Sequence, residues 1–434
     1  MAELVSFCAR CDSVHDIKIF DLGYLQPANC TACAAECAVA EFPRPCQYSR
    51  PPQRTGTAGR LSRPPQPRGR AIRLAAQRLR HQRIGHNPFA CAAETVRWFG
   101  AIQAQDYLGS LWAVALRTRS ATEASVERAI AERKIVRTWP LRGTLHFVAA
   151  DDARWMLELS AQRTLARSAS RLKREYSIDS RLIAQSRKVL TDALRGGNCL
   201  SRPELYRRLE DARIATKASR GLHLLWWHAH EGLVCLGPRA GKQQTFVLMD
   251  EWLPAVPPRS REESLAELAR RYFTSHGPAT VRDFAWWSGL AAGDAAIAVE
   301  MVAKELLAAK IDDQTYWQSP GVTTRAARGC HLLPAYDEYT VAYQDRSAIM
   351  TSKVAARADA GHGIFYPPIV IDGQVAGTWS RTLQQDCVAI TCRLFAPTDR
   401  RQQPALEAAA RRYAKFLGLK KLRLLPSRPR GAAS

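Results

Sequence analysis

Hydrophobic residues recur with helical or strand periodicity from about residue 72 onward, and this pattern predicts a series of helices and hairpins. Alternating β-branched and aromatic residues around Pro140 and Gly143 predict a two-stranded hairpin over 135–148. The helices expected before this hairpin cover residues 73–83, 87–102, 108–116 and 123–132. The first periodic module is therefore expected to be helical and to end in a hairpin.

The same order of elements returns twice. Helices are expected at 182–194 and 222–231, with a capping-box spacing from Ser201 to Glu204 between them, and a hairpin follows at 233–249. In the next copy the expected helices are 264–275, 280–287 and 295–309, before a strand at 311–317. This is the winged-helix order, so we expect three tandem winged-helix units, at 71–180, 181–258 and 259–320. Winged helices read DNA, contact proteins or serve as scaffold, so the pattern alone does not choose among these roles.

The last part of the chain, 321–434, is mostly strand-like. Asp372-Gly373 and Gly377 mark hairpins, and a helix expected at 407–417 ends at Gly418. We expect a small β-barrel or half-barrel closed by this helix. The predicted fold is therefore α+β, with three winged-helix units followed by a β-rich, barrel-like C-terminal domain.

Residues 1–70 form an N-terminal extension of different composition. Six of the 12 cysteines precede residue 50, and seven prolines lie between positions 43 and 67, so we expect this extension to be mostly disordered. Cys8, Cys11, Cys30 and Cys33 form two Cys-x2-Cys pairs, a spacing that fits a four-thiolate zinc site. Because no glycine follows either pair, an accidental clustering of cysteines stays open as the alternative.

The chain carries 63 Lys+Arg against 40 Asp+Glu, a formal net charge of +23. Residues 1–86 account for +7 of this charge and residues 87–434 for +16, so the periodic body itself is basic. Such a charge fits an anionic partner, namely nucleic acid, an anionic membrane face or an acidic protein. The sequence contains no long apolar run and no signal-peptide pattern, so we expect a soluble, cytoplasmic protein that does not span a membrane.

Several common catalytic signatures are absent. The sequence has no phosphate-binding G-x-x-x-x-G-K-[ST] loop, no G-x-G-x-x-G after a strand and no H-E-x-x-H, so nucleotide hydrolysis, dinucleotide binding and zinc-protease chemistry lack support. His223, His228 and His230 share one aromatic helix, and we expect them to pack there and not to bind a metal.

Four segments together resemble the AlkZ-type winged-helix DNA glycosylases over residues 75–425. They are Gln103-Ala104-Gln105 with Asp106, the hairpin from Arg137 to His146, the run from Pro334 to Tyr339, and residues 370–379. The resemblance implies three winged-helix units and a β-rich C-terminal domain. It also implies excision of N-alkylated purines, in some members crosslink unhooking, through a Gln-aliphatic-Gln motif that Gln103 and Gln105 preserve.

The chemistry explains why two glutamines suffice. A purine alkylated at N7 or N3 is cationic, so its glycosidic bond is already activated and no general acid need protonate it. The protein must only place a water and stabilise an oxocarbenium-like sugar, which neutral amides achieve by hydrogen bonding. We therefore predict action on cationic lesions and none on uracil or other neutral bases.

Geometry sets a condition on this assignment. Residues i and i+2 of an α-helix diverge by about 200°, so Gln103 and Gln105 meet one sugar only if the helix ends there. Asp106 has two interpretations: it orients the water, or it caps the following helix.

The hairpin supplies the expected DNA contacts. Arg142, Thr144 and His146 alternate on one strand and so share a face, while Arg137 and Trp139 share the alternation of the preceding strand. We predict that these five residues bind the DNA flanking the lesion, with Arg142 gripping phosphate. The pairs Trp226-Trp227 and Trp286-Trp287 are expected in the core, with stacking against an extruded base as the alternative. Tyr336–Tyr339, including Asp337 and Glu338, are expected to form a hydrogen-bonded turn, with a DNA-facing role as the alternative.

The predicted protein is thus a monomeric, cofactor-free and metal-independent DNA glycosylase whose partner is double-stranded DNA carrying alkylated purines. It is expected to be monofunctional because no lysine stands in the motif to form a Schiff base. A winged-helix DNA-binding protein or transcription regulator without catalysis is the alternative.

Overall fold

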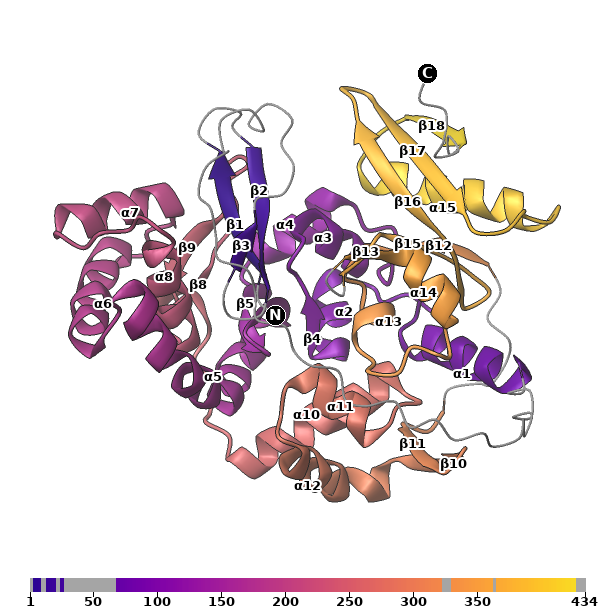
Figure 1. Ribbon diagram of the computed structural model, residues 1–434, viewed down its shortest axis with the longest axis horizontal. Helices are drawn as coiled ribbons and strands as arrows, with labels where there is room; N and C mark the ends of the chain where they lie inside the picture. Colours follow the sequence, from indigo (N-terminus) through magenta and orange to yellow (C-terminus); the bar gives the residue numbers. More distant parts are fainter. Residues whose placement is uncertain are drawn as a thin grey trace, which may run out of the picture. The chain divides into compact units, whose positions relative to one another are not determined.

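The computed structural model describes residues 3–8, 13–20, 24–26, 68–321, 329–361 and 364–426 (Figure 1). The chain divides into two compact units, Ala2–Gly69 and Arg70–Ser434. The larger one holds every predicted catalytic and DNA-binding residue.

The small unit contains an antiparallel sheet of three strands, β1 (Glu3–Cys8), β2 (Ser13–Phe20) and β3 (Tyr24–Gln26). Part of the extension that we expected to be disordered is therefore a sheet. The side chains of the predicted zinc ligands Cys8, Cys11, Cys30 and Cys33 lie outside the described residues, as does the proline-rich stretch.

The large unit begins with four helices, α1 (Arg68–His81), α2 (Ala92–Phe99), α3 (Tyr107–Ala115) and α4 (Glu123–Ala131). The prediction that the second helix runs to Ile102 was wrong. Gly100 adopts a left-handed φ of 75° and ends the helix, and Ala101–Gln103 forms strand β4 instead. The motif glutamines are therefore carried by a strand end and not by a helix end.

Strand β4 lies at the edge of a six-stranded sheet. The other strands are β5 (Ile135–Leu141), β6 (Thr144–Ala149), β7 (Leu200–Ser201), β8 (Val234–Leu236) and β9 (Thr245–Leu248), in the order β4-β6-β5-β8-β9-β7. Both predicted hairpins are present, and they are joined through the pair Arg137–Leu236 of β5 and β8. The first two predicted modules therefore share one sheet.

Five helices belong to this middle part of the chain. They are α5 (Ala153–Tyr176), α6 (Ser180–Leu194), α7 (Arg202–Asp211), α8 (Arg220–His230) and α9 (Met249–Trp252). The capping box predicted from Ser201 to Glu204 is present at the start of α7, where the Glu204 carboxylate accepts a hydrogen bond from the Ser201 backbone N–H. Helix α5 packs against β5, beneath the hairpin.

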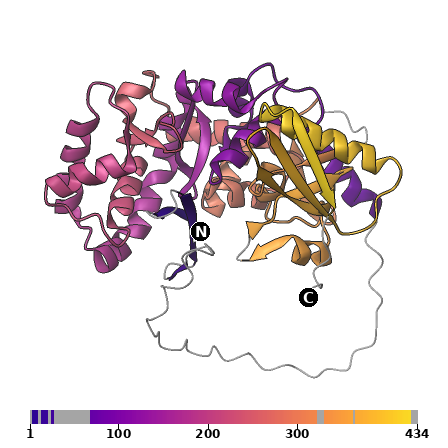
Figure 2. The ribbon, with the colours of Figure 1, turned by 90° about the horizontal axis from the view of Figure 1, so that it is seen from above.

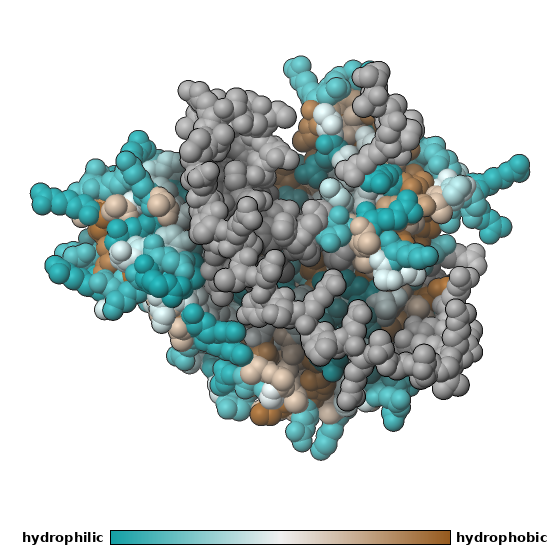
Figure 3. All heavy atoms as spheres, in the orientation of Figure 1, coloured by the Kyte–Doolittle hydropathy of each residue, from teal (hydrophilic) through white to brown (hydrophobic). Residues whose placement is uncertain are grey.

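The next segment contains three helices and a hairpin. They are α10 (Arg261–His276), α11 (Val281–Ser288), α12 (Ala292–Val302), β10 (Leu307–Ile311) and β11 (Gln314–Gln318). Helix α12 is shorter than predicted because the chain passes into β10. Hydrophilic residues dominate the described part of the face in Figure 3, and hydrophobic residues gather at its lower edge, where Figure 1 draws α12.

The C-terminal part holds a five-stranded sheet in the order β12-β15-β16-β17-β18. Its strands are β12 (Cys330–Leu332), β15 (Pro368–Ile371), β16 (Gln374–Leu383), β17 (Cys387–Leu394) and β18 (Lys421–Pro426). The strands β12 and β18 are not paired with each other, so among the described strands this sheet is open, which excludes the closed barrel but not the half-barrel of the two predicted forms. Helix α15 (Gln402–Phe416) packs against the sheet, in agreement with the predicted closing helix (Figure 2).

Shorter elements complete the C-terminal part, namely α13 (Glu338–Val341), α14 (Ser352–Ala358), β13 (Asp359–Gly361) and β14 (Ile364–Phe365). One hydrophobic core joins α1–α4 to the C-terminal sheet, and Trp112 of α3 lies edge-on to Tyr413 of α15 at 5.0 Å. This packing holds the segment that contains α13 against the start of α3. Among the described residues, no helix is long and apolar enough to cross a membrane.

Candidate active site

The two motif glutamines lie where the chain leaves strand β4. Gln103 pairs with His146 across β4 and β6, and Ala104 continues the ladder by donating to the Leu145 carbonyl at 2.8 Å. Alternate residues of an extended chain point to the same side, whereas residues two apart on a helix diverge. Because the motif lies at the end of β4, the two glutamine side chains are not forced apart as they would be on a helix. Gln103 and Gln105 are 9% and 6% exposed.

Gln103 is held at both its backbone and its side chain. Its backbone N–H donates to Glu338 Oε1 at 2.7 Å, and its side-chain Oε1 accepts a hydrogen bond from Arg142 at 3.4 Å. A carbonyl oxygen has two lone pairs, so Gln103 Oε1 keeps one for a water molecule. The orientation of this amide is therefore set before any substrate arrives.

Gln105 is tied to the same hairpin. Its Oε1 accepts from the Leu145 backbone N–H at 3.2 Å. The guanidinium of Arg137 donates to the Ala104 carbonyl at 2.6 and 2.9 Å and to the Gln105 carbonyl at 3.2 Å. Because a guanidinium presents its donors in a rigid fork, Arg137 fixes the backbone between the two glutamines.

Glu338 is fully buried, and both of its oxygens are engaged. In addition to Gln103, it accepts from Trp287 Nε1 at 2.9 Å and from His276 Nε2 at 3.2 Å. Burial alone would raise the pKa of Glu338, but the hydrogen bond and charge of His276, the charge of His146 and the Gln103 N–H lower this pKa below its ordinary value. Glu338 is therefore an ionised anchor for the motif and not a free base.

The neighbouring Asp337 forms a buried ion pair with Arg117, which follows α3. The carboxylate accepts two hydrogen bonds from Arg117, at 2.8 and 2.9 Å, and both side chains are 0% exposed. The remaining guanidinium donors of Arg117 bind the backbone carbonyls of Gln82 and Ala113 and the side chain of Gln82. Asp337 also caps α13 by accepting from the Tyr339 N–H at 2.9 Å. The predicted turn at 336–339 is thus an anchored helix start.

Arg142 sits at the tip of the hairpin. Arg142 and Gly143 both have positive φ, 54° and 70°, which is the conformation of a two-residue type I′ turn. The side chain crosses to α11, where it donates to the Trp286 carbonyl at 3.3 Å, and it passes over Gly289. Burial lowers the pKa of Arg142, and the Glu338 carboxylate partly offsets this. Arg142 thus links the hairpin tip, α11 and Gln103.

His146 is neutral in this structure at physiological pH. Burial, and then the neighbouring Arg142 cation, lower the pKa of His146 to about 4. Its Nδ1 lies 2.9 Å from the Thr144 carbonyl, which requires the proton on Nδ1 and leaves Nε2 as an acceptor. Among the described side chains, Nε2 has no hydrogen-bond partner.

The predicted DNA contacts need revision. Arg137, Trp139, Thr144 and His146 are only 5%, 9%, 7% and 0% exposed. Thr144 Oγ1 donates to the Leu141 carbonyl, and Trp139 belongs to the hydrophobic core beside α8. The strands are covered on both faces, so alternation along them does not select a solvent-facing side. Of the five residues, Arg142 at the turn retains partial exposure.

Asp106 occupies the N-cap position of α3, as one interpretation predicted, but its side chain makes no capping hydrogen bond. The carboxylate is half-buried and folds over Gly109, where any Cβ would collide with it. Gly109 is thereby required for this arrangement.

Sequence reasoning missed three functional neighbours of the glutamines: Glu338, Trp287 and His276. The Asp337-Glu338 pair was noted, but Gln103 and Glu338 are 235 positions apart. A buried carboxylate needs hydrogen-bond donors, but this requirement does not identify the residues that supply them. The signal available in the sequence was two consecutive acids between aromatic residues in a strand-like region.

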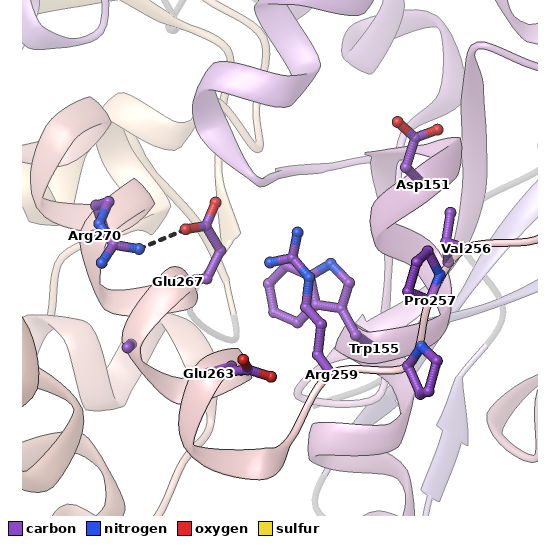
Figure 4. A pocket seen from close by; sticks show the side chains of 10 residues that line it. Asp151, Trp155, Val256, Pro257, Arg259, Glu263, Glu267 and Arg270 are labelled. Atoms are coloured by element: carbon purple, nitrogen blue, oxygen red, sulfur yellow. Dashed lines mark hydrogen bonds and ion pairs between the residues drawn. The ribbon is translucent and has the colours of Figure 1, made fainter.

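A cavity of about 550 Å³ lies elsewhere, between α5, α10 and the segment at 256–259 (Figure 4). In it, Arg259 lies over the Trp155 indole at 5.4 Å, and Glu267 binds Arg270. None of the residues around Gln103 lines this cavity, so it is separate from the candidate site.

The described residues contain no group of three or more His, Cys, Asp or Glu side chains arranged to hold a metal ion. His228 lies within hydrogen-bond distance of Ser186 and Glu231, and His230 of the Trp226 carbonyl. His228 and His230 are buried within the helical region, which confirms their predicted packing.

The fold is similar to that of a solved DNA glycosylase structure. The solved structure of the Streptomyces sahachiroi DNA glycosylase AlkZ matches with a TM-score of 0.68 and 22% identity, over 82% of this chain and 99% of that chain. An interstrand DNA cross-link repair glycosylase of Streptomyces sahachiroi is 26% identical over 372 residues, which are 80% of this chain and 96% of the relative.

The family model for AlkZ-like DNA glycosylases matches residues 96–416, a range that contains Gln103, the hairpin and Glu338. The chain therefore belongs to the AlkZ-like DNA glycosylase family and is a DNA repair glycosylase.

Proposed function

We propose that this glycosylase hydrolyses the N-glycosidic bond of cationic N-alkylated purines in double-stranded DNA, with Gln103 and Gln105 placing the attacking water. The observation that carries the proposal is the two-sided hold on Gln103, by Glu338 at its backbone and by Arg142 at its side chain. A preorganised acceptor costs no reorganisation when the transition state forms.

The proposed reaction needs no acid. The bond between the purine nitrogen and C1′ breaks, its electron pair neutralises the cationic base, and the water oxygen bonds to C1′. The proton released by the water passes to solvent. Gln103 Oε1 accepts a hydrogen bond from that water, and the amide dipoles of both glutamines lie where positive charge develops on the sugar.

The donor set of Glu338 supports a restriction to cationic bases. Its two oxygens accept from Gln103, Trp287 and His276, so the carboxylate is committed to holding the motif. Neutral bases need protonation or a strong general base, which amides do not provide. We propose that uracil resists excision for this reason.

The proposal extends to mechanism class and partners. No lysine stands between Gln103 and Asp106 to form a Schiff base, so we propose a monofunctional hydrolase. We also propose that this hydrolase needs no metal and acts as a monomer. The net charge of +16 on residues 87–434 supports salt-dependent binding to duplex DNA. Of the predicted contacts, partly exposed Arg142 is the one we retain for phosphate.

Three features support further parts of the proposal. The relative named for interstrand cross-link repair makes bulky adducts and crosslinks candidate substrates, because these also contain a cationic purine. The order of three helices and a hairpin in α10–β11 supports a winged-helix unit at 259–320. The helices that precede a hairpin in 71–180 and again in 181–258 support two further units there, although their hairpins share one sheet, and the separate five-stranded sheet supports a C-terminal domain at 321–434.

Excision by glutamine variants tests the assignment. Gln103→Ala and Gln105→Ala should each slow release of N7-methylguanine from a duplex by about 100-fold, the typical cost of removing one preorganised polar group. Gln185→Ala, at an exposed glutamine of α6, is the matched control and should keep the wild-type rate. A protein that binds duplex but releases no base would instead be the non-catalytic DNA-binding alternative.

A further inference from the structure

Helix α11 ends in two tryptophans with different surroundings. Trp287 is 0% exposed and belongs to the core, whereas Trp286 is 41% exposed. Successive residues of an α-helix project about 100° apart, which places one indole inside and the other at the surface. The sequence-based prediction that both would be in the core is therefore correct for Trp287 and wrong for Trp286.

Two routes fix this helix end to the catalytic motif. Trp287 donates to Glu338, which in turn accepts from the Gln103 backbone. Arg142 donates through one guanidinium nitrogen to the Trp286 carbonyl and through the other to Gln103 Oε1. A single guanidinium thus joins the backbone of Trp286 to the amide proposed to hold the water.

The exposed indole also has a set orientation. Its Nε1 donates to the Val341 carbonyl at 3.1 Å, so the ring is tethered to α13. The guanidinium carbon of Arg346 lies 5.9 Å from the ring centroid, so a cation already approaches this indole. Tryptophan offers the strongest cation–π interaction of the aromatic side chains.

We propose that the indole of Trp286 is the stacking platform for the cationic purine, and that it favours alkylated over neutral bases. This inference rests on the proposed function, since it concerns the base whose glycosidic bond Gln103 and Gln105 would cleave. An alkylated purine is a flat cation. It therefore gains both stacking and charge–quadrupole attraction on an indole, whereas a neutral purine gains stacking alone.

The test compares binding of three duplexes in the absence of cleavage. One carries 2′-fluoro-N7-methylguanosine, in which the fluorine slows glycosidic cleavage and the base keeps its charge. The second carries the neutral isostere 7-methyl-7-deazaguanine, and the third is undamaged. The proteins are wild type, Trp286→Phe, Trp286→Leu and the control Ile297→Ala, which removes a 49% exposed side chain of α12.

The wild type should bind the cationic duplex roughly tenfold more tightly than the isostere, a preference in the range of a cation–π contact. Trp286→Leu should lose the preference, Trp286→Phe should keep part of it, and Ile297→Ala should keep it all. Thermal unfolding midpoints of all variants identify any that fail to fold, and Trp286→Phe then carries the test.

Two results overturn the inference. One is the absence of a preference for the cationic duplex in the wild type. The other is a preference that survives in Trp286→Leu; an equal loss of affinity for all three duplexes would be such a case and would make Trp286 a general DNA contact. Failure of the proposed function is separate: wild-type protein would then release no N7-methylguanine, while the Trp286-dependent binding preference would persist.

Discussion

Gln103 is the residue at which the backbone and side-chain networks of the site meet. The sequence alone identified Gln103, because a motif of two glutamines flanking an aliphatic residue can be recognised without a structure. Glu338 could not be assigned in that way, since its hydrogen bond to Gln103 spans 235 positions. Local patterns report spacing within one element, whereas this contact depends on the packing of the C-terminal part against α3.

Removal of the charge at position 338 should disturb the positioning of Gln103 without weakening the binding of DNA. Glu338→Gln retains the size of the side chain but replaces one acceptor oxygen by an NH2 group, which faces donors already aimed at it. Because the end of β4 that carries Gln103 then shifts, the single-turnover excision rate should fall by about 10- to 100-fold. The affinity for lesion-containing duplex should change little, since Glu338 is fully buried.

Glu300→Gln serves as the matched control for this change, since Glu300 is exposed on α12 and should leave both quantities unaltered. Unfolding midpoints report any loss of stability. A Glu338→Gln protein that folds and excises at the wild-type rate would show that Glu338 has no positioning role.

The hairpin β5–β6 and the end of α11 are the elements that carry Arg142. The hairpin was predictable, because Gly143 and the alternating β-branched residues mark it. The end of α2 was harder to predict, because Ile102 in the strand continues the helical spacing of the buried residues Val96 and Phe99. Gly100 was the available signal, and sequence reasoning passed over it. Likewise, the alternation of side chains along the hairpin predicted which residues share a face, but it did not predict that both faces are buried.

Gly289 leaves room for the Arg142 side chain where the hairpin meets the end of α11. Its φ is 74°, and a Cβ there would lie 2.9 Å from Arg142 Cγ. Gly289→Ala should lower stability by about 1 kcal/mol or more, because alanine is strained at positive φ. It should also slow excision severalfold by displacing Arg142 from Gln103 Oε1.

Gly418→Ala provides a close comparison. Gly418 has a similar φ of 72°, and a methyl group added there would meet nothing within 4 Å, so this variant carries the backbone strain without the contact to Arg142. Both variants should lose stability in denaturant titrations, and only Gly289→Ala should lose excision rate. Equal excision rates per folded molecule in the two variants would refute the role assigned to Gly289.

At the scale of the whole molecule, one hydrophobic core joins α1–α4 to the C-terminal sheet. The sequence supported an α+β chain with repeated helical modules and a β-rich end, because periodicity is a local property. It did not predict the sheet that the first two modules share, nor the open C-terminal sheet. Both depend on which strand edges meet, and hydrophobic alternation reads the same for an open sheet and a barrel.

Buried neutral histidines make the stability of the large unit depend on pH. Burial lowers the pKa of His146, His223 and His230 to about 4 each. Below the unfolded value of about 6.5 the unfolded chain takes up protons that the folded chain does not, so stability falls as the pH is lowered. Each such histidine adds a slope of up to about 1.4 kcal/mol per pH unit between about pH 6 and 4.5.

Denaturant titrations at pH 7.5, 6.0 and 5.0 measure this dependence. The free energy of unfolding should decrease on acidification, and His230→Phe should make the slope shallower because one of these groups is removed. Stability that stays constant or increases towards pH 5 would contradict the burial of these histidines in their neutral form.

The role of Gln103 in excising cationic purines can be measured by single-turnover release of N7-methylguanine from a defined duplex, with wild type and Gln103→Ala side by side. We predict release by the wild-type protein, release about 100-fold slower by Gln103→Ala, and no release of uracil from the matched duplex by either. Release of N7-methylguanine by Gln103→Ala at the wild-type rate, or release of uracil by the wild-type protein, would contradict this prediction.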